Sequence, residues 1–145
     1  MLSFENIEDR KYFEDLLCQE GEVLEDYAFL FDFRDAHVKR REFNNARDRI
    51  FDDMMAPEGA KCSLQYPGIC DIHSGWTIDH IIPLSSNILN KTLRDITPEK
   101  GKKVPSQSIG SNHRKNLITA CRNCNNHKKH RFLDKDKIKN LLAQQ

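Results

Sequence analysis

Two adjacent polar residues, Asp79 and His80, interrupt an otherwise apolar segment, WTIDHIIPLSS at 76–86. A carboxylate is a hard oxygen ligand suited to Mg²⁺ or Mn²⁺. An imidazole is the side chain whose unperturbed pKa suits a general base near neutral pH. Together they are suited to metal-assisted hydrolysis, which needs an activated water and a cation on the substrate oxygens. The alternative is a pair of buried polar residues with hydrogen-bond partners.

The geometry of a strand limits how these two side chains act together. Residues 78–84 predict a buried strand, because most of them are apolar. Neighbouring residues of a strand point to opposite faces. We therefore expect Asp79 and His80 to reach one site only if the strand bends or ends beside them.

Four cysteines in the second half of the chain are suited to a structural metal site. Cys121 and Cys124 form a C-x2-C pair, the spacing at which two thiolates reach one tetrahedral zinc. Cys62 and Cys70 are farther apart, but a Pro-Gly turn between them can fold the loop back. We expect all four to bind one structural Zn²⁺, which would stabilise a module with a thin core.

Two alternatives remain open for these cysteines. His73 lies three residues after Cys70 and has the spacing to replace it as a ligand, or some of the thiols are free. The fifth cysteine, Cys18, lies in a helical pattern with no other ligand nearby, so we expect it to be a small buried hydrophobe.

The order of these motifs resembles the HNH nucleases of the ββα-metal superfamily. Three segments carry the resemblance, which covers residues 58–131: DHIIPL at 79–84, NHRKNL at 112–117 and CRNCNNHKK at 121–129. The combined pattern is far more specific than any part of it. The resemblance implies an α+β fold, in which a small ββα-metal module with a structural zinc is preceded by a helical N-terminal region.

The resemblance also implies roles for particular residues. His80 would be the general base, and Asp79 and Asn125 would bind one Mg²⁺ or Mn²⁺ ion. Asn116 would hold the loop between the strands by hydrogen bonds and help to aim His80. The chain is thus similar to an H-N-N variant of the family, expected to act as a DNA endonuclease that leaves 5′-phosphate ends.

One position departs from part of the family. Colicin-type members have a third ligand, a histidine one helical turn after the first, where this chain has Lys129. The metal would then have two protein ligands. His127 stands two residues after Asn125, so we expect it on another face of the helix, in contact with phosphate or solvent.

The charge of the chain is unevenly distributed. Residues 1–60 have 16 Asp and Glu against 8 Lys and Arg, a net charge of −8, whereas residues 61–145 have 6 against 15, a net charge of +9. A basic half suits nucleic acid, although attraction between the halves or a solvated surface explains the same pattern. The expected partner is double-stranded DNA, contacted by Arg114, Lys115, Lys128, Lys129 and Arg131.

Helical patterns predict the organisation of the rest. Residues 5–20, 22–41 and 42–55 predict helices, the last of which ends before a breaker cluster at 56–59. We expect a helical region over 1–57, the HNH module over 58–133 and a C-terminal helix over 134–145. Within the module, NLITAC predicts the second strand and residues 125–133 a helix. The polar connection between the strands, about 25 residues long, is unusual unless it is functional or ordered by a bound partner.

Composition excludes some classes of protein. No apolar run is long enough to span a bilayer, and the acidic N-terminus lacks the features of a signal peptide. We therefore expect a cytoplasmic protein with reduced cysteines. A hydrophobic content of 38% with 31% charged residues is low for a core that is stable by itself, so we expect a metal or a partner to stabilise the fold.

Other functions stay open beside the DNA endonuclease. A zinc-stabilised nucleic-acid-binding module without catalysis would use the same cysteines and basic helix. An effector domain that cleaves RNA, or a domain cut from a larger defence protein, is a further alternative. The acidic helices would then serve as a homodimer interface, as an inhibitory flap over the basic face, or as a docking surface for a larger parent or partner protein. Restriction, phage-type nicking and triggered defence all stay open as biological roles.

Overall fold

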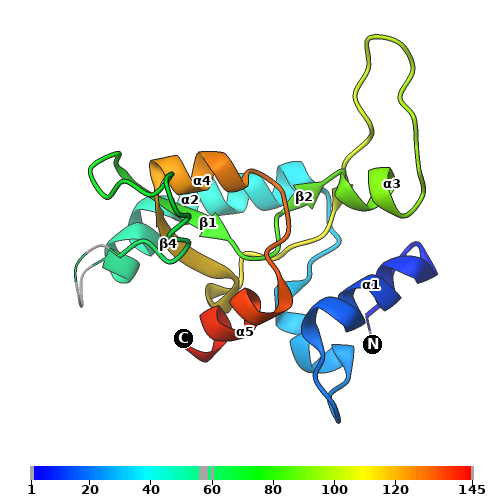
Figure 1. The fold of residues 1–145 in the computed structure, drawn as a ribbon, viewed down its shortest axis with the longest axis horizontal. Helices are drawn as coiled ribbons and strands as arrows, with labels where there is room; N and C mark the ends of the chain where they lie inside the picture. Colours follow the sequence, from blue (N-terminus) through cyan, green and yellow to red (C-terminus); the bar gives the residue numbers. More distant parts are fainter. Residues whose placement is uncertain (1, 56–58, 60, 145) are drawn as a thin grey trace.

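The computed structural model describes residues 2–55, 59 and 61–144 and has a mixed α+β fold (Figure 1). Its elements are α1 (Ile7–Leu17), the 3-10 helix η1 (Leu24–Leu30), α2 (Ala36–Met55), β1 (Trp76–His80), β2 (Ser85–Ser86), α3 (Ile88–Thr92), β3 (Gln107–Ser108), the 3-10 helix η2 (Arg114–Asn116), β4 (Leu117–Cys121), α4 (Arg122–Lys128) and α5 (Lys135–Ala143). Within the described residues no helix is both long and apolar enough to cross a membrane.

Two strands distant in sequence form the sheet that carries the polar motifs. β1 and β4 pair antiparallel, from Trp76 with Cys121 to His80 with Leu117, and α4 follows β4 directly and packs on both strands. The second strand is thus confirmed. β1 ends at His80 instead of continuing to residue 84, because the Asn116 side chain takes both backbone hydrogen bonds of Ile82.

The prediction of one helix over 22–41 and another over 42–55 is wrong. η1 ends at Leu30, Phe31 is extended and forms a β-bridge with Gly110, and a single helix, α2, follows. Helical spacing in the sequence does not reveal this break, because the bridge partner is distant along the chain. The start of α2 is marked by Asp35, whose Oδ1 accepts a hydrogen bond from His37 N at 2.8 Å. Of the breaker cluster predicted at 56–59, residues 56–58 lie outside the described residues.

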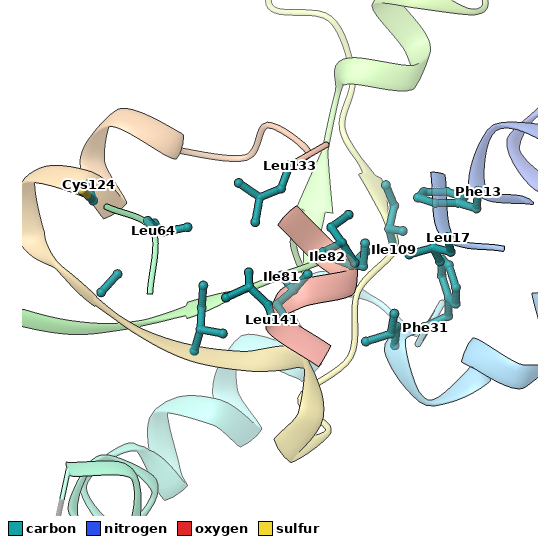
Figure 2. Close-up of a cluster of buried hydrophobic side chains, with 14 of the residues drawn as sticks. Phe13, Leu17, Phe31, Leu64, Ile81, Ile82, Ile109, Cys124, Leu133 and Leu141 are labelled. Carbon is teal, nitrogen blue, oxygen red and sulfur yellow. The ribbon is translucent and has the colours of Figure 1, made fainter. Parts of the chain in front are cut away.

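One hydrophobic core joins the N-terminal helices to the β1–β4 sheet. Figure 2 shows Phe13, Leu17 and Phe31 beside Ile82 and Ile109, and the same cluster continues toward the C-terminal helix. Burying each such side chain stabilises the fold by about 1.5–3 kcal/mol. The expected boundary between 57 and 58 therefore does not separate two cores.

An ion-pair network binds the long connection between β1 and β4 to α1. Arg94 Nη1 donates to Asp9 Oδ1 at 2.6 Å and to Glu8 Oε1 at 3.1 Å, while Gln107 Nε2 donates to Asp9 Oδ2 at 2.8 Å. Asp9 is wholly buried, so its charge requires these partners. The predicted connection thus contains α3 and β3 and is ordered at its base, while the segment between them extends away from the body (Figure 1).

Gly110 lies where the chain has no room for a side chain. A Cβ at this position would be 2.0 Å from the carbonyl oxygen of Ile82 and 2.5 Å from that of Pro83. We expect Gly110→Ala to lower the free energy of unfolding by more than about 2 kcal/mol, measured by urea denaturation. Gly101→Ala is the control, because a Cβ there meets no atom and only its positive φ opposes the change. An equal loss in both variants contradicts the steric argument.

Candidate functional site

Four cysteines converge at one end of the β1–β4 sheet. The Sγ atoms of Cys62, Cys70, Cys121 and Cys124 all lie within 4.8 Å of one another, and those of Cys70 and Cys121 are 3.9 Å apart. Four sulfurs around a tetrahedral Zn²⁺, with bonds of about 2.3 Å, are separated by about 3.8 Å. This cysteine cluster therefore fits a metal such as zinc, held by all four side chains.

Backbone N–H groups surround the sulfurs of the cysteine cluster. The N–H groups of Cys124 and Asp71 donate to Cys121 Sγ at 3.4 and 3.5 Å, and that of Tyr66 donates to Cys124 Sγ at 3.4 Å. Burial opposes ionisation of Cys121, but the N–H donors and the neighbouring thiols together lower the pKa of this thiol to about 6, whereas burial raises the pKa of Cys70 and of Cys124. The surroundings thus favour the thiolate that a metal requires at Cys121. His73, the alternative ligand, is exposed and lies outside the cluster.

Asp79 points toward α4 from the end of β1. Its carboxylate is buried, and Lys128 Nζ lies 3.0 Å from Oδ2 while donating to the carbonyl of His80 at 2.9 Å. Among the described residues, none donates a well-directed hydrogen bond to Oδ2. Lys128 is 1% exposed, so the expectation that it contacts DNA from an exposed basic face is wrong. It stands three residues after Asn125 and therefore shares the sheet-facing side of the helix.

Asn125 presents an amide oxygen on this same side of the sheet. Its Nδ2 donates to Thr77 Oγ1 at 3.1 Å, and Thr77 shares a face of β1 with Asp79, because side chains two residues apart point the same way. The Oδ1 atom of Asn125 is left as an acceptor. One carboxylate and one amide oxygen suit Mg²⁺, which keeps several of its waters, so Asp79 and Asn125 are the residues that would hold it.

His80 points to the opposite face of β1, toward α2. Its ring centroid lies 5.0 Å from that of Phe43, in an edge-on arrangement, and its Nε2 is 2.9 Å from Asn112 Oδ1. Burial lowers the pKa of His80 below its ordinary value, and the hydrogen bond to Asn112 offsets part of this shift. The imidazole is therefore neutral at physiological pH, which is the form that accepts a proton.

A contact with α2 determines which ring nitrogen of His80 carries the hydrogen. Asn112 Nδ2 donates to the backbone carbonyl of Lys39 at 2.9 Å, so Asn112 turns its Oδ1 toward His80. An amide oxygen only accepts hydrogen bonds, so His80 Nε2 must be the donor. The lone pair of the neutral ring is then on Nδ1. Sequence reasoning missed Asn112, because this residue meets α2 and His80 only in the folded chain.

A buried ammonium anchors α2 beside His80. Lys39 Nζ donates to the carbonyl oxygens of Asp32, Leu84 and Gly110 at 2.7, 2.9 and 2.6 Å. Burial lowers the pKa of Lys39 to about 8. The sequence gives no signal for this role, since a lysine in an amphipathic helix is ordinarily exposed.

Asn116 is wholly buried between the two strands. Its Oδ1 accepts from Ile82 N at 2.8 Å, and its Nδ2 donates to the carbonyls of Ile82 and Ser111 at 3.0 and 2.7 Å. These bonds fasten the segment after His80 to the loop before β4. This is the place that the motif predicts for a residue that holds the loop.

The other basic residues expected to contact DNA lie in two separate places. Lys129 and Arg131 follow α4 on its outer side, whereas Arg114 and Lys115 belong to η2 and line a different hollow beside α5. Lys115 Nζ also lies 5.6 Å from the centre of the Phe29 ring. The structure therefore does not bring these four cations together on one surface.

Comparison with known proteins gives no match: no model of a protein family, no curated protein and no solved structure is found to be similar. The geometry thus carries the functional argument. One end of the β1–β4 sheet has the cysteine cluster, and the other has Asp79 and His80 on opposite faces. Asn125 lies on the Asp79 face, where it contacts Thr77.

Proposed function

We propose that the protein is a metal-dependent endonuclease of the HNH type that hydrolyses DNA phosphodiester bonds. The observation that best supports this is the end of β1, where Asp79 and His80 point to opposite faces. One face offers two oxygen donors for a divalent ion, and the other offers a neutral imidazole. A phosphate that lies across the end of the strand meets both groups, because the chain leaves the sheet after His80.

In this mechanism His80 is the general base. Its Nδ1 takes a proton from a water molecule, which attacks the phosphorus in line while the bond to the 3′ oxygen breaks. The leaving 3′ oxygen takes a proton from solvent water, and His80 later returns its proton to solvent. The products are a 5′-phosphate and a 3′-hydroxyl. Asp79 and Asn125 would hold Mg²⁺ or Mn²⁺, which would supply positive charge to the phosphate when bound. The hydrogen bonds of Asn116 hold the segment after His80 against the loop before β4. They therefore keep the end of β1, with Asp79 and His80, in a fixed position.

Asn112 is expected to position His80 in this reaction. In Asn112→Ala the His80 Nε2–H loses its acceptor and the ring is free to rotate, so the single-turnover cleavage rate should fall about 10- to 100-fold. Asn112 does not contact the face with Asp79, so the affinity for DNA and the Mg²⁺ concentration at half-maximal rate should not change. Asn112→Asp keeps an acceptor and should recover part of the rate.

The neighbouring His113→Ala variant provides a matched control for Asn112. His113 is exposed and its ring lies tilted against Phe29, with 5.3 Å between the ring centroids, so its loss should leave cleavage unchanged. Full activity of Asn112→Ala contradicts the positioning role. So does a loss of rate that is matched by an equal loss of affinity for DNA.

Plasmid cleavage tests the proposed function directly. The zinc-loaded protein should convert supercoiled plasmid to nicked or linear DNA with Mg²⁺ or Mn²⁺ and not without a divalent ion. Asp79→Asn should abolish this activity, because the ion then loses its one anionic ligand. The ends should be ligated directly, since ligation requires a 5′-phosphate. A protein that cuts no DNA with either ion contradicts the proposal.

A second candidate is a zinc-stabilised nucleic-acid-binding module without catalysis. The observation in its favour is the Lys128 ammonium, which by itself compensates the charge of Asp79. In that case DNA binds without cleavage, and Asp79→Asn changes nothing but stability. An RNA substrate in the same assay distinguishes the remaining alternative, an RNA-cleaving effector.

A further inference from the structure

A groove of about 720 Å³ lies on the outer side of α4. Three segments line it: the loop before β1 with Gly68 and Ile69, α3 with Ile88 and Lys91, and α4 together with the residues that follow it. We call it the outer groove.

The outer groove and Asp79 lie on opposite sides of α4. Asn125 and Lys128 contact β1, whereas Asn123, Asn126 and His127 line the groove. A helix with its side chains is about 10 Å across. A ligand in the outer groove therefore leaves the end of β1 free, and the two form separate sites.

The formal charges that line the outer groove are all positive. Lys91, Lys129 and Arg131 line the groove, and the described residues that line it include no Asp or Glu. None of these three cations takes part in an ion pair within the described part of the chain. The Arg131 guanidinium is held in place by the carbonyls of His127 and Lys128. Uncompensated cations around a concave surface attract anions.

Lys129 has a backbone conformation that usually requires glycine. Its φ of 54° and ψ of −130° end α4, so the predicted helix over 125–133 is wrong from this residue onward. A side chain in this region is strained, and such strain recurs at ligand-binding sites. Glycine would form the same turn without strain, so the lysine contributes something other than the turn.

We propose that the outer groove binds the phosphate backbone of a nucleic-acid strand through Lys91, Lys129 and Arg131. Each strand of DNA carries one negative charge per about 3.4 Å, so a polyanion engages several of these cations at once. The inference rests on the proposed function for the identity of the anion. The groove holds the strand beside the phosphate that is cleaved and takes no part in hydrolysis.

Lys129→Gly tests this proposal without threatening the fold. The variant removes the cation and relieves the strained backbone, so the melting temperature should stay the same or rise. Binding of a fluorescent DNA duplex is measured by anisotropy in a His80→Ala background, with zinc-loaded protein and no added divalent ion. We expect the affinity to fall about 3- to 10-fold and the slope of log K against log salt to decrease by about 1. Lys91→Ala should act in the same way.

Two controls separate charge from backbone effects. Asp95→Gly relieves another positive φ, of 51°, without removing a cation, and Lys139→Ala removes an exposed cation from α5. Neither should weaken binding. If the affinity and the salt slope are unchanged in Lys129→Gly and Lys91→Ala, the proposal is overturned, even if the wild-type protein cleaves DNA. A wild-type protein that binds no nucleic acid also overturns it. Binding that depends on Lys129 in a protein that cleaves nothing refutes the nuclease and supports the groove.

Discussion

Replacing Cys121 by serine is expected to unfold the protein and release its zinc. Cys121 Sγ belongs to the cysteine cluster and lies 3.9 Å from Cys70 Sγ, and Cys62, Cys121 and Cys124 belong to the hydrophobic core. Structural zinc contributes on the order of 10–16 kcal/mol in zinc-finger peptides, as much as the whole stability of a typical domain, about 5–15 kcal/mol. The variant should therefore show no cooperative thermal transition by circular dichroism.

Inductively coupled plasma mass spectrometry should find one zinc per chain in the wild-type protein. The protein should lose its thermal transition when a chelator removes the metal. Cys18→Ser is the matched control, since Cys18 is half-buried beside the core and does not belong to the cluster. It should retain one zinc, with a melting temperature changed by only a few degrees. A metal-free wild-type protein that melts at the same temperature with and without chelator would refute the structural zinc.

Features encoded by local spacing were accessible from the sequence. The C-x2-C pair predicts Cys121 and Cys124 side by side, and a second pair before β1 completes the cluster once the strands align. Asn116 is likewise placed by its motif. Lys128 was accessible in principle, because its spacing of three from Asn125 places both on one side of α4. Its burial against Asp79 was missed because a run of basic residues resembles a solvated face.

Features that depend on distant contacts were not accessible. The break between η1 and α2 follows from the bridge of Phe31 with Gly110, and no local pattern encodes that pairing. The same holds for the contacts of α2 with His80, through Phe43 and through the carbonyl of Lys39 that orients Asn112. The acidic N-terminal segment looked like a separate region, but α1 and η1 share the hydrophobic core, and α2 lies against the proposed base through Phe43.

His80→Ala is expected to lower the rate of DNA cleavage by about 10²- to 10⁴-fold, the usual contribution of a general base. The reason is that the neutral ring has its only lone pair on Nδ1, and no other imidazole belongs to the end of β1. The fold should survive, because the side chain is only half-buried and Asn112 keeps its bond to the carbonyl of Lys39. Zinc content, melting temperature and affinity for DNA should therefore match the wild type.

His37→Ala provides the control for His80→Ala, since His37 is exposed on α2 and its hydrogen bond to Asp35 is made by its backbone N–H. It should cleave at the wild-type rate. If His80→Ala cleaves equally fast, His80 is not the base. If both variants and the wild type bind DNA without cleaving it, the end of β1 has a structural role, in which Lys128 and Asp79 form an ordinary buried ion pair. Loss of cleavage in His80→Ala alone, with binding intact, requires a chemical role for the imidazole, because packing and charge elsewhere are unchanged.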